Sequence, residues 1–183
     1  MTTIIFAHPW HGSFNKAILD TITSKFEQLN KAYKVIDLHK NNFNPVFSEE
    51  ELAVYNQGKA LDPLILYYQE IIKSSSEMIF IFPNWWNTMP AILKGFFDKV
   101  LLKDFAFNYE GGFNALLEIE KTTVITTSEK PSPSFKNMIE NGFIGDMLNP
   151  IGIRNATWLS CEGTSRGTDE MRKEFLKRVE EQV

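Results

Sequence analysis

Polar and aromatic side chains gather in loops that follow short apolar runs. The first of these loops, HPWHGSFN, carries His8, Ser13 and Asn15 between the run TIIFAH and a helical segment. The backbone N–H groups at a helix start have no partner inside the helix, and the helix dipole favours an anion there. With the Ser13 hydroxyl and the Asn15 amide as further donors, the loop is suited to a phosphate. The alternative is that Ser13 serves only as the N-cap of the helix.

A second loop, PNWWNT, follows the apolar run EMIFI and precedes a segment with helical periodicity. A planar aromatic cofactor requires flat apolar contacts and main-chain N–H groups along its polar edge, and the turn from Pro83 to Asn87 offers both. Trp85 and Trp86 are adjacent, so in an extended turn their side chains point to different sides and cannot both enter one core. We therefore expect at least one to face a site or a partner. The alternative is plain packing in the core or in an interface.

Other chemistries lack their motifs. The first loop has no G-x-G-x-x-G pattern, which disfavours a dinucleotide-binding Rossmann loop. Ser13 has no G-x-S-x-G context, so an acyl-transfer nucleophile is not expected. No His, Cys or carboxylate residues show metal-ligand spacing, and we predict no metal site.

The composition excludes several classes of protein. The chain of 183 residues has a net charge of −4 and no basic run, so a nucleic-acid partner is not expected. A single cysteine rules out an internal disulfide framework and suggests a reducing compartment. No segment reads as a signal peptide or approaches the roughly 20 apolar residues of a membrane span, so we expect a cytoplasmic protein. Aromatic residues make up 13%, which favours a stacking site or an oligomer interface.

The elements that must position these loops alternate between strands and helices. The sequence predicts strands over Thr3–His8, Lys34–Leu38, Glu77–Phe82, Lys121–Thr127 and Asn155–Gly163. It predicts helices from Ser13, from a capping box at Ser48 and Glu51, and over Asp62–Ser74, Ala91–Leu102, Phe135–Leu148 and Thr168–Val183. The even spacing predicts one domain over residues 1–183.

This alternation predicts an α/β fold, a flavodoxin-like three-layer sandwich with a five-stranded parallel sheet of order 2-1-3-4-5. Ligands of such sheets bind beyond the carboxyl ends of the strands, where the strand order reverses. In this order the reversal lies between the first and third strands. The loops HPWHGSFN and PNWWNT lie there, and TTSEKPSPS after the fourth strand lies beside them. The unusual residues therefore fall where the fold would place a site.

The stretch FPNWWNTMPAILKGFFDKVL resembles the signature of the flavodoxin-like NAD(P)H:quinone oxidoreductases, F-P-x-x-W-x-x-x-P-A-x-L-K-G-(aromatic)-x-(D/E)-(R/K)-V. The matching residues are Phe82, Pro83, Trp86, Pro90, Ala91, Leu93, Lys94, Gly95, Phe96, Asp98, Lys99 and Val100. The first loop and its helix, the segment KDFAFNYEGG, and the pair Thr126-Thr127 are similar to the same family. In length the chain is closer to the short bacterial branch, which includes ancillary reductases of potassium-efflux systems, than to the longer animal enzymes.

The resemblance implies a homodimeric flavoprotein that reduces quinones with NADH or NADPH by two-electron, ping-pong hydride transfer. FMN is the expected flavin, and FAD is the alternative. The cofactor-binding residues that the resemblance implies are His8, Ser13, Phe14, Asn15 and Ala17 at the phosphate end, Pro83, Asn84, Trp85, Trp86 and Asn87 around the ring, and Thr126, Thr127, Ser128 and Glu129 at its pyrimidine edge. Trp86, Phe107 and Phe135 are the candidates for the substrate face, with further aromatics expected from the second subunit.

Two departures set this chain apart from the family pattern. Ser128 and Glu129 replace a pair of glycines, and a carboxylate there would repel the negative charge of a reduced flavin. Phe135 and Ile144 stand where longer members carry a Tyr and a His, and neither can donate a proton. An alternative function is therefore a flavin-binding regulatory subunit of a membrane transporter with little turnover of its own. An electron carrier of flavodoxin type is a third option, which the aromatic excess disfavours.

Overall fold

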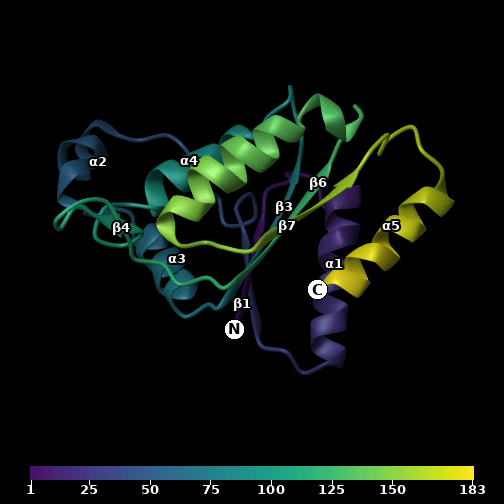
Figure 1. Cartoon of the computed structure of the whole chain (residues 1–183), viewed down its shortest axis with the longest axis horizontal. Coiled ribbons are helices and arrows are strands. Elements are labelled where there is room, and N and C mark those ends of the chain that lie inside the picture. Colours follow the sequence, from purple (N-terminus) through teal and green to yellow (C-terminus); the bar gives the residue numbers. More distant parts are fainter.

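The computed structural model describes residues 1–183 and has the predicted flavodoxin-like α/β architecture (Figure 1). Five parallel strands form one sheet in the order β2-β1-β3-β6-β7. Their bounds are Thr2–Phe6 for β1, Tyr33–Asp37 for β2, Glu77–Pro83 for β3, Lys121–Thr127 for β6 and Ala156–Cys161 for β7. Numbered within the sheet alone, this order is 2-1-3-4-5, as the sequence predicted. The reversal of strand order falls at β1 and β3.

Five α-helices accompany the sheet. Their bounds are Phe14–Gln28 for α1, Glu49–Val54 for α2, Pro63–Lys73 for α3, Ala91–Val100 for α4 and Asp169–Gln182 for α5. Local capping explains where several of them begin, because the side chains of Ser13, Asp62 and Thr168 each accept a backbone N–H of the first turn. Ser48 and Glu51 form the predicted capping box of α2. No helix is long and apolar enough to cross a lipid bilayer.

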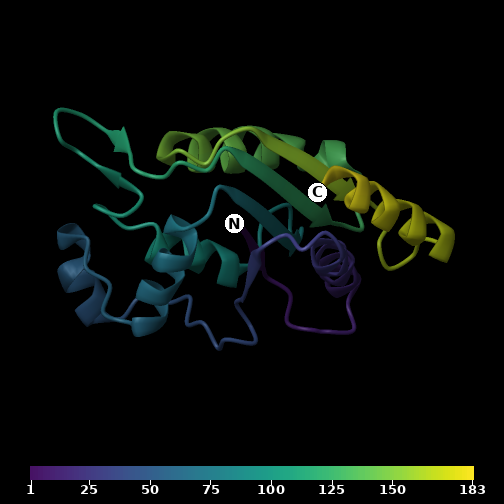
Figure 2. The ribbon, with the colours of Figure 1, turned by 90° about the horizontal axis from the view of Figure 1, so that it is seen from below.

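The core has two layers, one on each face of the sheet, because strand side chains alternate between the faces. Ile79 and Ile81 of β3 pack with α1 and α5, whereas Phe80 and Phe82 face α3, α4 and the helical segment Met138–Leu148. Figure 2 shows α1 and α5 together on one side of the sheet. Every residue of β3 is buried, so the central strand is a rigid support for the loop that follows it.

Two segments differ from the sequence prediction. The expected helix over Phe135–Leu148 is a short 3₁₀ turn at Ser132–Ser134 followed by a π-helix over Met138–Leu148. At Gly145 a Cβ would lie 3.3 Å from the carbonyl oxygen of Glu140, so the glycine allows the tight approach of that turn. An unpredicted hairpin of β4, Phe107–Asn108, and β5, Asn114–Ala115, lies between α4 and β6.

Candidate active site

A cleft of about 670 Å³ is lined by residues that follow the carboxyl ends of the sheet strands, and Figure 1 shows these strand ends at the upper edge of the sheet. Sixteen residues from the predicted loops and the start of α5 line it: His8, Trp10, Gly12, Ser13, Phe14, Asn15, Ala17, Pro83, Asn84, Trp85, Thr127, Ser128, Glu129, Thr164, Ser165 and Arg172. The cleft is therefore where the reversal of strand order predicts a ligand.

The start of α1 forms one end of the cleft. The Ser13 hydroxyl accepts the N–H of Lys16 at 3.2 Å, so Ser13 is an N-cap. The N–H groups of Phe14 and Asn15 form no hydrogen bond within the chain. Asn15 is buried, and its Oδ1 also lacks a partner. Because both free donors lie at the positive end of the helix dipole, this end of the cleft suits an anion.

The loop after β3 forms a strained turn. Trp85 N donates to Thr88 O at 2.9 Å, and Thr88 N donates back to Trp85 O at 3.1 Å. The two residues between them, Trp86 and Asn87, have φ values of 53° and 61°, as in a type I′ turn. For a non-glycine residue this region costs on the order of 1–2 kcal/mol. Such strain tends to be retained where a site requires it.

The turn presents both tryptophans outside the core. Trp85 lines the cleft, and its ring centroid lies 5.9 Å from that of His8. Trp86 is 98% exposed. The N–H groups of Trp86 and Asn87 form no hydrogen bond within the chain. A flat aromatic wall and two free donors thus lie side by side, which is the combination that a planar ligand with a polar edge requires.

The loop after β6 forms the opposite wall. Asn84 N donates to the carbonyl oxygen of Thr127 at 2.7 Å, which ties this loop to the strained turn. The Glu129 carboxylate accepts the N–H of Ser165, and this hydrogen bond lowers the pKa of Glu129. The Glu129 carboxylate, which would repel a reduced flavin, is therefore ionised, and its hydrogen bond holds it to the loop after β7. The Asn84 Oδ1 is buried without a partner.

His8 lies at the floor of the cleft as a neutral ring. Burial is the main cause that lowers its pKa. The N–H of Trp10 donates to His8 Nδ1 at 3.1 Å, so in the neutral ring the proton lies on Nε2. His8 can therefore donate one hydrogen bond from Nε2 without adding positive charge.

The structure brings most of the predicted cofactor residues together. Eleven line the cleft: His8, Ser13, Phe14, Asn15, Ala17, Pro83, Asn84, Trp85, Thr127, Ser128 and Glu129. Trp86 and Asn87 line an adjoining cavity. Thr126 does not line either cavity, because its side chain is buried and its hydroxyl accepts the Trp158 indole N–H at 2.9 Å. Successive side chains of a strand point to opposite faces, so only Thr127 turns to the cleft.

The two phenylalanines predicted at the substrate face lie outside the cleft. Phe135 is buried in the core, where its ring centroid lies 5.6 Å from that of Trp158. Phe107 lies on β4, at the end of the molecule away from the cleft (Figure 1), and stacks on Phe113 at 5.3 Å. Neither residue lines the cleft of its own chain. Phe107 and Phe135 lie away from the cleft because of how the β4–β5 hairpin and the segment before the π-helix pack in three dimensions. The hydrophobic periodicity of the sequence does not predict that packing.

Five lining residues were not predicted to be in the site: Trp10, Gly12, Thr164, Ser165 and Arg172. Arg172 is the one cation among them, and its Nη1 and Nη2 bind Thr164 O at 2.8 Å and Asp169 Oδ1 at 2.9 Å. The signal that could have found Thr164 and Ser165 is their position after the last strand. Arg172 lies in the first turn of α5 among other charged residues, and no motif there distinguishes it as a site residue.

Comparison with known proteins was made with the whole chain. The Flavodoxin_2 model, described as a flavodoxin-like fold, matches residues 1–183. An uncharacterized NAD(P)H oxidoreductase of Haemophilus influenzae is 37% identical over 159 residues, which cover 83% of this chain and 78% of that protein. The uncharacterized NAD(P)H oxidoreductase YcaK of Escherichia coli is 32% identical over 188 residues, which cover 98% and 93%. The solved NAD(P)H:quinone oxidoreductase of Methanothermobacter marburgensis is 29% identical, with a TM-score of 0.87 over 98% of this chain and 95% of that one.

Proposed function

The chain belongs to the Flavodoxin_2 family of flavodoxin-like fold, and we propose that it is a flavin-dependent NAD(P)H oxidoreductase that reduces quinones. Three similar proteins support this class of reaction. Two are named NAD(P)H oxidoreductases, and the third is named an NAD(P)H:quinone oxidoreductase. The observation that carries the proposal is one cleft that combines unpaired N–H groups at a helix start with an aromatic turn and an opposing polar loop.

The residues present fit a flavin. The free N–H groups of Phe14 and Asn15 and the Ser13 hydroxyl would hold its phosphate. The N–H groups of Trp86 and Asn87, which have no partner within the chain, would meet the polar edge of the ring. The buried amides of Asn15 and Asn84 each keep an oxygen without a hydrogen bond. Because unsatisfied buried polar atoms are costly, they indicate a ligand that completes them.

FMN is the flavin that the loops favour. A dinucleotide such as FAD would need room between the first loop and the loop after β7. Hydrogen bonds close that second loop on the β6 loop, because Thr164 N donates to Ser128 O at 3.1 Å and Ser165 N donates to Glu129. One anion site at the start of α1 matches one phosphate.

The reaction follows from what these residues hold in place. A flavin held by these residues would supply the hydride-transfer chemistry between NADH or NADPH and the quinone. The fixed N–H groups of Trp86 and Asn87 are positioned to stabilise negative charge at the polar edge, and they need no reorganisation because the turn is closed by hydrogen bonds. The two substrates would use the same open face in turn, in a ping-pong cycle.

No side chain can supply a proton at the two positions where longer members of the family carry a Tyr and a His. Phe135 is buried in the core, and Ile144 lies on the π-helix and packs on that core. Neither bears a titratable group. The one proton that must accompany the hydride to form the quinol would therefore come from water, through the open side of the cleft.

A homodimer would complete the site. Tyr109 and Phe113 are exposed on the β4–β5 hairpin, which Figure 2 shows extended away from the body of the molecule. A groove of about 630 Å³ runs beside the cleft and is lined mostly by apolar residues, among them Trp86, Met138 and Met147. Apolar and aromatic surface of this kind is typical of subunit interfaces. In this arrangement Phe107 would act from the second copy.

Steady-state turnover tests the proposal. Protein loaded with FMN is expected to oxidise NADH or NADPH with a benzoquinone, giving parallel double-reciprocal lines as both substrates are varied. Protein that binds FMN but shows no quinone-dependent oxidation above free FMN would contradict the enzyme and favour the regulatory alternative. Sedimentation of the same sample measures whether two chains associate.

A further inference from the structure

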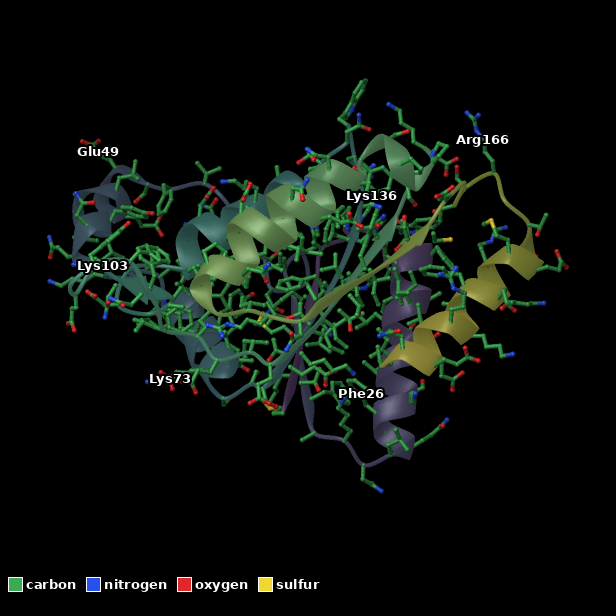
Figure 3. All side chains as sticks on the ribbon, viewed as in Figure 1. Phe26, Glu49, Lys73, Lys103, Lys136 and Arg166 are labelled. Carbon is green, nitrogen blue, oxygen red and sulfur yellow. The ribbon has the colours of Figure 1, made fainter.

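A second cavity adjoins the cleft on the side of the strained turn. It has a volume of about 800 Å³ and is lined by Asn84, Trp85, Trp86, Asn87, Ser128, Glu129, Lys130 and Arg166. Two of these residues are cations, and they come from the loops after β6 and β7. Figure 3 shows Arg166 projecting from the loop after β7 into solvent, where its side chain is 91% exposed.

Neither cation is neutralised within the chain. Lys130 forms no ion pair. Arg166 Nε lies 4.0 Å from Glu129 Oε2, and an exposed pair at that separation is weak. The other oxygen of Glu129 is already committed to the Ser165 N–H. Two cations against the one carboxylate of Glu129 leave the lining of the cavity with a net positive charge, although the protein as a whole is negative.

Arg172, the cation of the main cleft, offers a contrast. Its guanidinium is held by Thr164 O at 2.8 Å and by Asp169 Oδ1 at 2.9 Å. A bound anion would have to share Arg172 with a carboxylate that is already in contact with it. Lys130 has no ion pair, and Arg166 has only the exposed pair with Glu129 at 4.0 Å, so these two cations are more available to an incoming anion.

The cavity also carries an aromatic platform. The Trp86 indole is exposed, and the hydrogen-bonded turn fixes its backbone. A purine stacks well on an indole because both present flat π-faces. Lys and Arg side chains bind phosphate through charge-assisted hydrogen bonds. An indole face beside two free cations therefore has the chemistry to recognise a phosphorylated adenosine.

We propose that this cavity holds the adenosine end of the nicotinamide donor and that Lys130 and Arg166 bind its 2′-phosphate, so that the protein prefers NADPH to NADH. This inference rests on the proposed function, which supplies a nicotinamide donor at the adjoining cleft. The two donors differ only in the 2′-phosphate, and the pyrophosphate common to both gives no preference. Free cations at the rim would discriminate between them through that phosphate.

The direct test is binding of two probes that differ in the same group. Calorimetric titration of the full chain without flavin compares 2′,5′-ADP, which carries the 2′-phosphate, with 5′-AMP, which lacks it. We expect 2′,5′-ADP to bind about tenfold more tightly at low salt, and the difference to shrink as salt is added.

Charge-removing variants locate the effect. Lys130→Gln and Arg166→Gln are each expected to weaken 2′,5′-ADP about fivefold and to leave 5′-AMP within twofold. Lys177→Gln and Arg178→Gln are matched controls, since both residues are exposed on α5 and neither lines the cavity. Lys130→Arg and Arg166→Lys are expected to retain most of the discrimination, which separates charge from folding.

Kinetics on FMN-loaded protein gives the second readout. The kcat/KM ratio of NADPH to NADH is expected to be about ten in the native protein and to fall toward one in the Lys130→Gln/Arg166→Gln double variant, mainly through the KM for NADPH. Equal binding of the two probes, equal loss of both in the variants, or an equal loss in the α5 controls would overturn the inference. Because Lys130 and Arg166 line this cavity and not the main cleft, the effect of their variants on probe binding reports on this cavity even if the flavin proposal fails.

Discussion

Asn15 and Thr127 join the start of α1 to the end of β6, because Asn15 Nδ2 donates to Thr127 Oγ1 at 2.8 Å between two buried side chains. The residues are 112 positions apart in sequence. The contact fixes the anion-binding helix start relative to the loop that forms the far wall of the cleft. It therefore sets the distance between the proposed phosphate and ring positions.

Breaking this contact should weaken both folding and flavin binding. Asn15→Leu leaves the Thr127 hydroxyl without a donor and removes an amide from the cleft, so we expect a loss of about 1–3 kcal/mol in unfolding free energy and at least about tenfold in FMN affinity. Urea unfolding and FMN titration measure the two effects. If Asn15→Leu and Thr127→Val act through one hydrogen bond, the double variant should lose less stability than the sum of the single variants. Strict additivity would show that the bond contributes nothing.

The backbone at Trp86 predicts an unusual ranking of substitutions. Its φ of 53° suits glycine but not alanine, and the exposed side chain has no packing to lose within the chain. Trp86→Gly should therefore be more stable than Trp86→Ala by about 1 kcal/mol. Urea unfolding of the two variants at low protein concentration checks this. Equal stability, or a more stable alanine variant, would mean that the turn relaxes when the indole is removed.

A buried cation anchors α4 to α2 and to the loop before α2. Lys99 is 2% exposed, and its Nζ lies 2.9 Å from Glu51 Oε1 and 3.1 Å from the carbonyl oxygen of Val46. Lys99→Met leaves the Glu51 carboxylate and the Val46 carbonyl oxygen without their partner, so we expect a loss of about 2–4 kcal/mol in unfolding free energy. Lys94→Met is the control on the same helix, because that exposed lysine pairs only with Asp98 and should cost less than about 0.5 kcal/mol. Comparable losses at the two positions would contradict the anchoring role.

Glu129 and Glu162 bind each other's loops. Glu129, after β6, accepts the N–H of Ser165, and Glu162, after β7, accepts the N–H of Ser132 at 2.8 Å. These bonds lower the pKa of both carboxyls. A lowered pKa in the folded state means that each carboxylate contributes its full stabilisation above its ordinary pKa, and that this contribution is lost as the pH falls through the lowered value.

The part of the FMN affinity that depends on these two carboxylates should therefore be level from pH 7 to about pH 5 and should fall below that range as the two loops separate. In Glu129→Gln/Glu162→Gln the affinity should be weaker at pH 7, and the acid-dependent decline should be smaller. Fluorescence titration at a series of pH values measures this. A decline of the same size in the native and double-variant proteins would assign it to other groups.

Features that depend on neighbours in sequence were predictable. The strand Lys121–Thr127 was predicted with the bounds that the structure shows, and the caps at Ser13 and Ser48 lie where their hydrogen-bonding side chains indicate. Buried strands and helix caps are determined by a few adjacent residues. The cleft then followed from the strand order, because a parallel sheet brings the ends of distant strands together.

Features that depend on tertiary approach were missed. Thr126 and Thr127 are the same type of residue, and only the alternation of side chains along the strand decides which hydroxyl faces the cleft. Arg172 enters the site because α5 docks beside α1, which its charged sequence does not reveal. The β4–β5 hairpin has strands of two residues each, too short for a periodic signal. The family resemblance, and not the pattern of residues, carried the expectation for Phe107 and Phe135.

The central claim is that the loops after β1, β3 and β6 form one flavin site, and titration of FMN with the purified chain tests it most directly. Flavin emission should be quenched by the neighbouring tryptophan, with an end point at one FMN per chain and tighter binding than for FAD. Emission that stays that of free FMN at an excess of folded protein would contradict the claim.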